Sequence, residues 1–585
     1  MEGRTIFVSH QWLSYEYPDP DGKHLAQLKQ LLTDLMSGSM KVKSCWRTQL
    51  LSESTCTVSA SQWAAALPHM FIWMDYSGIP QVRAEPLDTS PCGSPAVRKH
   101  GSAASTSTFA STMSNTVSAC TTSTSDHRFG ESSSPMLADL KKAINSIPGY
   151  VERSSLMLVL VPPCAHKDTY QICNFSTWRS RGWCRAEFMA ASLSRKSVKV
   201  MVHHGNQHPS FINSAAIWEL PPGHGHFSCC ALKHTLNGEA IPCDKASLHT
   251  VIEGMVQRKA RHLRMSGQHE RALFYRAAKH HFLDALPAQE KLDGSSEVAS
   301  MQHGPAAVSA LQEQLAWESA DTNLGETTGF TLLACAVLAD DLEAVRHLIQ
   351  IGSIVNLGTS QRWPDMGCVP KGCTPLMAAM GFSRFEIVQE LLKAQAEPES
   401  SNKEEHKWNA FFFACALGRA DNIKKWLVKF PDYDLEHRDG YGMTALQLAA
   451  MGPSISTPAL SVLLAARADV SKRCYVGGRA LSMAAGKADS DPEAVQLLLN
   501  ARADVNRPAR ALTAKWKAAL VACRSVYRLG KHSALLDILA QEKGLIPLHS
   551  AYRMGHHEIV QILKEAGADE AHQNSLGQKP QDMAA

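Results

Sequence analysis

Short apolar runs alternate with longer stretches of helical periodicity between Met1 and Ala215. The apolar and β-branched runs at residues 5–12, 71–75, 156–161 and 198–203 are typical of strands. Residues 24–36 and 182–196 are typical of helices, and the first places Leu25, Leu28, Leu31, Leu32 and Leu35 on one stripe. Strands that are apolar throughout are covered on both faces. We therefore expect an open, mainly parallel, doubly wound α/β sheet in residues 1–215.

A polar insertion interrupts this pattern. Between Gly101 and Pro135, 18 of 35 residues are Ser or Thr, and large apolar residues are few. Such a composition cannot bury a core. We expect residues 82–135 to be a disordered surface segment within the first domain.

The second half of the chain repeats itself. Equivalent positions are occupied by Thr331, Thr374, Ala410, Thr444, Arg479 and Ile546, at steps of 43, 36, 34, 35 and 67. Each segment begins with a helix N-terminus, continues with Ala-Ala, and ends in a Val-x-x-Leu-Leu stripe before a turn. One such unit cannot bury its apolar face alone, so several units must stack into one elongated core.

These segments resemble ankyrin repeats. The motifs that carry the resemblance are the Thr-Pro-Leu start, the Ala-Ala pair and the Ala-Asp-Val-Asn turn, and about six or seven copies fit residues 326–585. The resemblance implies an all-α solenoid whose turn tips and inner helices bind another protein. We expect a degenerate repeat around Leu512 to Leu539, because the last step is twice as long as a single unit.

The first step, from Thr331 to Thr374, is longer than the next three and indicates an insertion at residues 357–371. An insertion at a turn of a solenoid usually lies on its binding face. Trp363 is therefore a candidate contact with the partner, and a solvated loop with one exposed Trp is the alternative.

The composition argues against several classes of protein but does not indicate a function. The formal net charge is +4 from 59 basic and 55 acidic residues, which gives no global field for nucleic acid or anionic membrane. No apolar run reaches the roughly 18 to 20 residues of a membrane span. The 16 cysteines show no repeated spacing, and the first residues lack the pattern of a signal peptide. A reducing, cytoplasmic setting is the expectation.

Residues 216–325 are expected to be a helical and irregular connector. The stretch "GHGHFSCC", with Cys173 and Cys184, supplies zinc-type ligands but lacks a paired C-x-x-C spacing, so no metal centre is predicted. The basic helical stretch from Met255 to Leu286 carries charges that we expect to be solvated. No P-loop, G-x-S-x-G or H-E-x-x-H motif occurs.

The first domain carries a second resemblance. A strand ending "FVSH", a later "AINSI" followed by "SLMLVLVPP", and a "WC-x-x-E" helix occur in the order of the Toll/interleukin-1 receptor (TIR) fold. This resemblance implies a flavodoxin-like sheet and a signalling domain that allows self-association. The segment "IWMDYSGIPQ" departs from the usual second strand and loop of that family.

In TIR domains that consume NAD⁺, the Glu of this motif is catalytic, which by resemblance assigns that role to Glu187. Trp183 lies four residues earlier on the same helical face, where it offers an apolar wall. His10 and Trp12 follow the first strand, at the sheet edge where ligands bind in such folds. These three are candidate substrate-binding residues. The alternatives are core packing, and for Glu187 a helix-dipole role or a pair with Arg181 or Arg185.

Two functions follow from the sequence. The first is a cytoplasmic adaptor that binds protein partners through ankyrin repeats and needs no cofactor. The second is an NAD⁺ hydrolase with Glu187 as its carboxylate and NAD⁺ as its substrate, directed by the repeats.

Overall fold

The computed structural model describes most of the chain outside the polar insertion. Described are residues 4–74, 142 and 146–583, apart from 15–16, 46–47, 49–54, 197, 206–207, 214–219, 232, 237–238, 241–242, 288–303, 318–329, 361–369, 402–406, 453–455, 488–489 and 531–533. The expected disordered segment, residues 82–135, lies outside the described residues. No helix among the described residues is long and apolar enough to cross a membrane.

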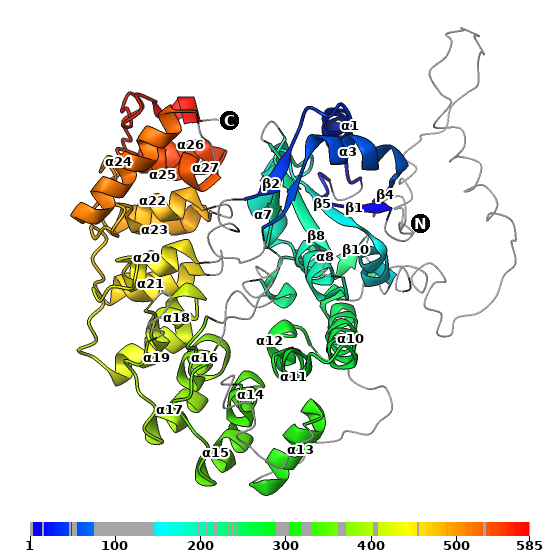
Figure 1. Cartoon of the computed structure of the whole chain (residues 1–585), viewed down its shortest axis with the longest axis vertical. Coiled ribbons are helices and arrows are strands. Elements are labelled where there is room, and N and C mark those ends of the chain that lie inside the picture. Colours follow the sequence, from blue (N-terminus) through cyan, green and yellow to red (C-terminus); the bar gives the residue numbers. More distant parts are fainter. Residues whose placement is uncertain are drawn as a thin grey trace, which may run out of the picture. The chain divides into compact units, whose positions relative to one another are not determined.

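A seven-stranded sheet forms the centre of the first domain (Figure 1). Its order is β3-β2-β9-β8-β5-β1-β4, and β4, β1, β5 and β8 run parallel. The strands are β1 (Thr5–His10), β2 (Val42–Ser44), β3 (Thr57–Val58), β4 (Phe71–Met74), β5 (Leu156–Leu160), β8 (Lys199–His203) and β9 (Ser210–Ile212). The pairs β8–β9 and β2–β3 are antiparallel, so the predicted parallel sheet extends into a mixed edge.

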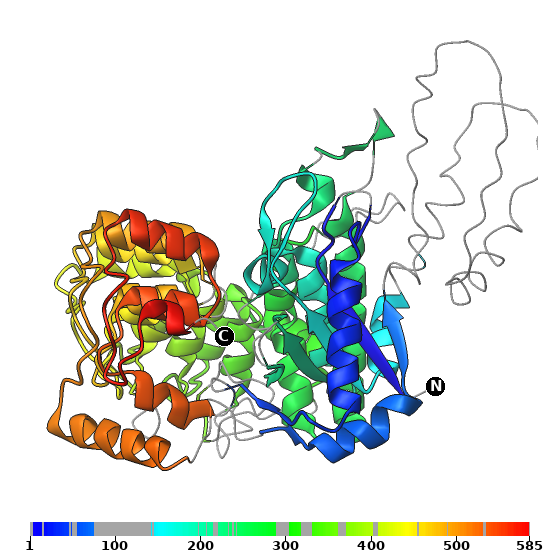
Figure 2. The same cartoon turned by 90° about the horizontal axis from the view of Figure 1, so that it is seen from above.

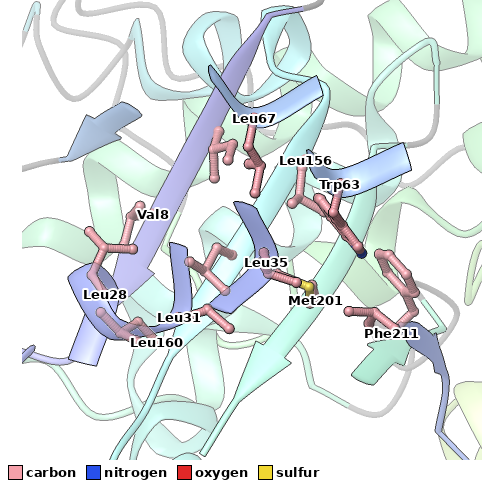
Figure 3. Close-up of a cluster of buried hydrophobic side chains, with 13 residues drawn as sticks. Val8, Leu28, Leu31, Leu35, Trp63, Leu67, Leu156, Leu160, Met201 and Phe211 are labelled. Carbon is pink, nitrogen blue, oxygen red and sulfur yellow. The ribbon is translucent and has the colours of Figure 1, made fainter. Parts of the chain in front are cut away.

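Helices cover both faces of the parallel strands. On one face, α1 (Lys23–Met36) and α3 (Ala60–Ala66) bury a cluster with β1, β5 and β8. Figure 3 shows Leu28, Leu31 and Leu35 of α1 pointing at the sheet. The predicted stripe is thus buried at these three positions, whereas Leu25 is 44% exposed. On the other face, α8 (Gly182–Leu193) packs against β1 and β8.

The connector contains helices that belong to both halves of the chain. Helix α10 (Asp244–Met265) packs on α8, and Lys259 is buried instead of solvated, with its amine donating to the Ser194 carbonyl at 2.8 Å. Helices α11 (His269–Ala277) and α13 (Pro305–Leu315) pack against each other and against the first repeat. They precede residue 326, so the stack of helices begins inside the expected connector.

The repeats form two rows of helices. The inner row consists of α14 (Leu332–Leu338), α16 (Pro375–Phe382), α18 (Ala410–Ala416), α20 (Ala445–Met451), α22 (Ala480–Gly486) and α26 (Pro547–Arg553). The outer row consists of α15 (Leu342–Gln350), α17 (Phe385–Lys393), α19 (Ala420–Lys429), α21 (Thr457–Ala465), α23 (Pro492–Asn500) and α27 (His557–Glu565). Neighbours within each row pack together. Six stacked pairs thus lie within the described residues.

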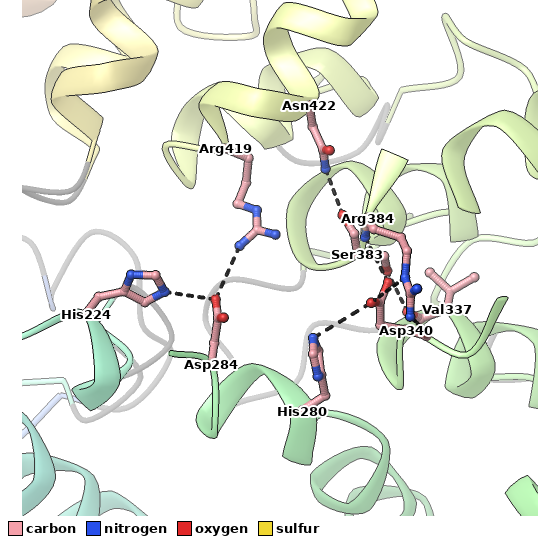
Figure 4. A network of polar contacts seen from close by, with 9 residues as sticks. All are labelled: His224, His280, Asp284, Val337, Asp340, Ser383, Arg384, Arg419 and Asn422. Atoms are coloured by element: carbon pink, nitrogen blue, oxygen red, sulfur yellow. Dashed lines mark hydrogen bonds and ion pairs between the residues drawn. The ribbon is translucent and has the colours of Figure 1, made fainter. Parts of the chain in front are cut away.

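Polar groups join successive repeats and the connector (Figure 4). Arg384 donates to both carboxylate oxygens of Asp340, each at 2.8 Å, and His280 of α12 (Lys279–Phe282) lies 3.9 Å from the same carboxylate. Asp284 lies between His224 at 2.9 Å and Arg419 at 3.9 Å. Burial alone raises the pKa of Asp284, but the hydrogen bond from His224 and the charge of Arg419 outweigh it and hold the pKa at about 2.

The predicted degenerate repeat is wrong in one respect: its helices do not enter the stack. Helices α24 (Ala514–Arg528) and α25 (Ala534–Gln541) pack on each other, while α22 packs directly against α26. The Ala509 N–H donates to the Leu545 carbonyl at 2.8 Å, and the Gly544 N–H donates to the Ala509 carbonyl at 2.9 Å. The inserted segment therefore leaves the stack of repeats and returns to it at the same place. Figures 1 and 2 show α24 beside the stacked helices.

Replacing residues 513–540 with a short Gly-Ser linker is expected to leave the repeats folded. The two ends already meet through backbone hydrogen bonds, and the contact of α22 with α26 needs no residue from the inserted hairpin. Circular dichroism is expected to show the loss of only the inserted helices, with the thermal midpoint nearly unchanged. Loss of cooperative unfolding would show instead that the hairpin is part of the core.

Candidate functional site

The order of the strands defines where a ligand would bind on the sheet. After β1 the chain forms β2 and β3 at the far edge of the sheet, then β4 pairs with β1 on one side and β5 pairs with β1 on the other. In open α/β sheets, the crevice for ligands lies at the carboxyl ends of the strands where this direction reverses. Ser9 and His10 are the last residues of β1, so they lie at this point.

Ser9 and His10 face opposite sides of the sheet, because successive side chains of a strand alternate. The Ser9 hydroxyl contacts Glu187 of α8, and the His10 ring contacts His24 of α1. These hydrogen bonds thus join Glu187 to Ser9 and His10 to His24, and the grouping of His10 with Glu187 stays a prediction.

Glu187 lies in a buried chain of hydrogen bonds. The Ser9 hydroxyl donates to its Oε2 at 2.5 Å, and the indole N–H of Trp178 donates to the Ser9 oxygen at 2.9 Å. Trp178 belongs to the short helix α7 (Phe175–Ser180) and is 1% exposed. Glu187 itself is 7% exposed. The Glu187 carboxylate is therefore held under the end of β1 and covered by protein.

Two arginines of this stretch, Arg181 and Arg185, donate hydrogen bonds that join α8 to neighbouring segments. Arg185 donates to the carbonyls of Arg179 at 2.6 Å and Pro221 at 3.2 Å, and Arg181 donates to the Ser228 hydroxyl at 3.0 Å. These bonds tie α8 to the connector. They account for the Arg-rich character of the stretch around α8.

Trp183 is turned toward the connector. Its indole N–H donates to the Asp244 carboxylate at 2.9 Å, at the start of α10. Trp12 follows β1 and is half-buried. Trp363, the predicted partner contact, lies outside the described residues. Among these candidates, Glu187 is joined to the end of β1 by the hydrogen bond from Ser9.

Helix α8 begins at Gly182, where another segment of the chain packs closely against the backbone. A Cβ on Gly182 would lie 2.0 Å from the ring of Phe227, and a Cβ on Gly225 would lie 2.4 Å from the Gly182 nitrogen. Backbone hydrogen bonds join His226 to Ser180 and Gly182 at this crossing. The connector therefore packs directly on the N-terminus of α8.

His10 and His24 form a buried pair, with 3.1 Å between their Nδ1 atoms. Burial, and to a smaller extent the neighbouring His10, lower the pKa of His24 to about 4. The neutral form of His24 is thus favoured in the folded protein. This pair lies on the α1 side of the sheet, away from Glu187.

A basic surface lies on the inserted hairpin and the turn before it. Residues 502–530 contain seven Lys or Arg and one acidic residue, Asp504, a net charge of +6, although the whole chain is only +4. The exposed cations are Arg502, Arg507, Arg510, Lys515, Lys517 and Arg528. The net charge of the whole chain does not reveal this local excess of positive charge. Counting charges in a sliding window along the sequence reveals it.

Apolar side chains on α24 accompany these charges. Val521 is 54% exposed, Leu529 is 80% exposed, and Leu520 is the buried residue that anchors the helix. We call residues 502–530 the basic insert surface. A helix with exposed cations and exposed apolar groups is suited to an acidic, partly apolar partner.

Four side chains of the connector form a cluster that the sequence reasoning missed. Cys229, Cys230, His234 and Cys243 place their ligand atoms within 4.8 Å of one another. From the sequence, Cys229 and Cys230 were considered with Cys173 and Cys184. In the structure, Cys173 packs with Cys164 and Leu13.

Comparison with known families finds ankyrin repeats in two stretches of the second half. A family model described as ankyrin repeats, with three copies, matches residues 298–402, and a single ankyrin repeat model matches residues 543–575. The C-terminal half of this chain contains ankyrin repeats. The first match begins ahead of residue 326 and includes α13, in agreement with the packing of α13 on α15.

One solved structure similar to this chain is the ankyrin repeat domain of Bcl-3, described as a unique member of the IkappaB protein family. The identity is 24%, the match covers 46% of this chain and 96% of that chain, and the TM-score is 0.30. No curated protein matches the chain.

Acidification is expected to loosen the sheet through His24. Its pKa is about 4 when folded and about 6.5 when unfolded, so the unfolded state takes up the proton first. Neutral His24 makes its full contribution to the free energy of unfolding above pH 6.5. About 3 kcal/mol of that free energy is lost as the pH falls to 4. Hydrogen exchange of β1, corrected for intrinsic rates, measures this loss.

The matched variant is His24→Gln, which keeps a hydrogen-bonding group beside His10. Protection of β1 in this variant is expected to depend less on pH than in the wild type. Equal pH dependence in both proteins would contradict the role given to His24.

Proposed function

We propose that this chain is a scaffold that binds an acidic protein partner through its ankyrin repeats, with the basic insert surface as a principal contact. The observation that carries the proposal is the hairpin α24–α25, which extends from the stack without belonging to its core. A segment that the fold does not need, yet that concentrates charge and exposed apolar groups, is suited to recognition.

Charge and shape together favour protein over other polyanions. Exposed Val521 and Leu529 on α24 would gain from an apolar contact that a phosphate backbone does not offer. Ankyrin stacks provide adjoining inner helices and turn tips as an extended surface. A partner segment that alternates acidic and apolar residues would match both features.

For the first domain, we propose a TIR-like signalling role in which the repeats select the partner and the sheet domain transmits the signal. Support comes from the parallel order β4-β1-β5-β8 and from the buried "WC-x-x-E" helix α8 that packs on it. Self-association of this domain is part of the same proposal.

Reversal of three cations on α24 is expected to weaken partner binding at least tenfold, or about 1.4 kcal/mol. The variant is Lys515→Glu, Lys517→Glu and Arg528→Glu in the full chain. Partners are first found by comparing proteins captured by wild type and variant, and each candidate is then purified. Calorimetry at two salt concentrations gives the Kd, which should also lose much of its salt dependence in the variant.

The matched control reverses Lys424, Lys425 and Lys429, three exposed cations on the outer helix α19. This control is expected to bind the partner as the wild type does. Equal loss in both variants would contradict the assignment to the basic insert surface. Binding of anionic vesicles or duplex DNA, with the same dependence on α24, would contradict a protein partner.

Cleavage of NAD⁺ is the second candidate, and the position of Glu187 at the direction reversal of the sheet favours it. The reaction needs a carboxylate that reaches the ribose carbon as charge develops there. In this structure the Glu187 carboxylate accepts a hydrogen bond from Ser9 and is covered. This arrangement supports the scaffold more than the enzyme.

The full chain incubated with NAD⁺ is expected to release no nicotinamide, both alone and in the presence of a crowding agent. Chromatography of nicotinamide and ADP-ribose measures this directly. Release that disappears in Glu187→Gln, but persists in the exposed-site control Glu386→Gln, would establish the enzyme and overturn the expectation.

A further inference from the structure

Three cysteines and one histidine of the connector converge in the short stretch from Cys229 to Cys243. Cys229 and Cys230 lie in the short helix α9 (Ser228–Ala231), His234 lies in the turn after it, and Cys243 directly precedes α10. Between His234 and Cys243 the chain forms the antiparallel pair β10 (Thr235–Leu236) and β11 (Glu239–Ala240). This hairpin brings Cys243 back beside the first two cysteines.

The separations match a tetrahedral metal site. The Sγ atoms of Cys229 and Cys230 are 4.0 Å apart, and those of Cys230 and Cys243 are 3.9 Å apart. In a tetrahedral zinc site with Zn–S bonds of about 2.3 Å, two sulfur ligands lie about 3.8 Å apart. A disulfide would need about 2.05 Å, so these cysteines are not bonded to one another.

The imidazole of His234 supplies an independent observation. Its Nε2 atom is buried and has no hydrogen-bond partner. A buried polar atom without a partner costs free energy unless another ligand satisfies it. Lys233 and His234 also have positive φ angles of 52° and 56°, a conformation that non-glycine residues rarely adopt. The chain thus adopts an unfavourable turn that holds this ring beside the sulfurs.

The start of α10 provides a backbone donor for the Cys229 sulfur. The backbone N–H of Asp244 points to the Cys229 sulfur, at 3.5 Å, and it belongs to the first turn of the 22-residue helix α10. Free N–H groups at a helix N-terminus stabilise negative charge. Hydrogen bonds from backbone N–H groups to ligating sulfurs are typical outer contacts of metal sites.

We propose that Cys229, Cys230, His234 and Cys243 bind one Zn²⁺. Three thiolates and one imidazole are a zinc-type ligand set, since harder cations prefer oxygen ligands. Four protein ligands leave no position for water or substrate. The site is therefore structural.

The zinc fixes the start of α10 against α8. Trp183 of α8 donates to Asp244, which directly follows the ligand Cys243, and Arg181 donates to Ser228, which directly precedes the ligand Cys229. At the far end of α8, Lys259 of α10 donates to the Ser194 carbonyl. Metal at one end and Lys259 at the other hold the two helices side by side.

The full chain, purified without chelator, is expected to contain about one zinc per molecule by plasma mass spectrometry. Cys230→Ser is the first variant, because Cys230 is the exposed ligand and its change disturbs packing least. Dialysis against a weak chelator should remove zinc from this variant and not from the wild type. Cys523→Ser, outside the cluster, is the matched control and should keep its zinc.

Cobalt provides a readout that does not depend on the stability of any variant. Wild-type protein stripped of metal and titrated with Co²⁺ should show the visible absorption of a tetrahedral site with sulfur ligands, and equimolar Zn²⁺ should remove it. Cys230→His, which keeps a zinc-type ligand, should retain binding with a shifted spectrum. Zinc should also increase the hydrogen-exchange protection of residues 228–250.

Three results would overturn the proposal. The first is wild-type protein that contains no zinc and does not bind Co²⁺ or Zn²⁺ after purification under reducing conditions. The second is zinc content that is unchanged in Cys230→Ser and Cys243→Ser. The third is a disulfide among Cys229, Cys230 and Cys243 in freshly isolated protein, found by peptide mass spectrometry.

Discussion

Burial of a helix that carries charge is the constraint on which the first half of the molecule depends. Helix α8 lies between the sheet and the connector, with Arg185 at 3% and Glu187 at 7% exposure. Buried charges are tolerated when hydrogen bonds replace water. Ser9 supplies such a bond from the sheet, and the Arg179 and Pro221 carbonyls supply bonds to Arg185. The sheet is therefore completed by residues that follow it in the chain, and the connector is part of the same folded unit.

Periodicity predicted most of the architecture. The apolar runs of β1, β5 and β8 and the stripe of α1 were visible in the sequence because burial imposes a regular pattern on strands and helices. The repeats were recognisable because each copy must bury the same apolar face against its neighbours and therefore keeps a similar sequence pattern. The long step between Arg479 and Ile546 was ambiguous, since spacing alone does not distinguish an extra repeat from an inserted hairpin.

The roles of the candidate site residues stay predictions, and the geometry around them could not be read from the sequence. His10 and Glu187 were grouped because both belong near the carboxyl edge of the sheet, but strand alternation sends His10 toward α1 and Ser9 toward Glu187. Trp183 was assigned to a ligand wall, whereas the connector provides Asp244 as its partner. The sequence pointed to Cys229 and Cys230 but not to His234 and Cys243, because the ligands come from an adjacent pair, a turn and a helix start rather than from two C-x-x-C pairs.

The coincident ends of the inserted hairpin have a consequence for how this protein changes over generations. Mutation can lengthen, shorten or rewrite the segment between Ala509 and Gly544, because the backbone hydrogen bonds at its base isolate the stack from what happens beyond them. Selection on partner choice and selection on folding thus act on separate stretches of the gene. Related chains would then diverge fastest in this hairpin while their helical rows stay alike.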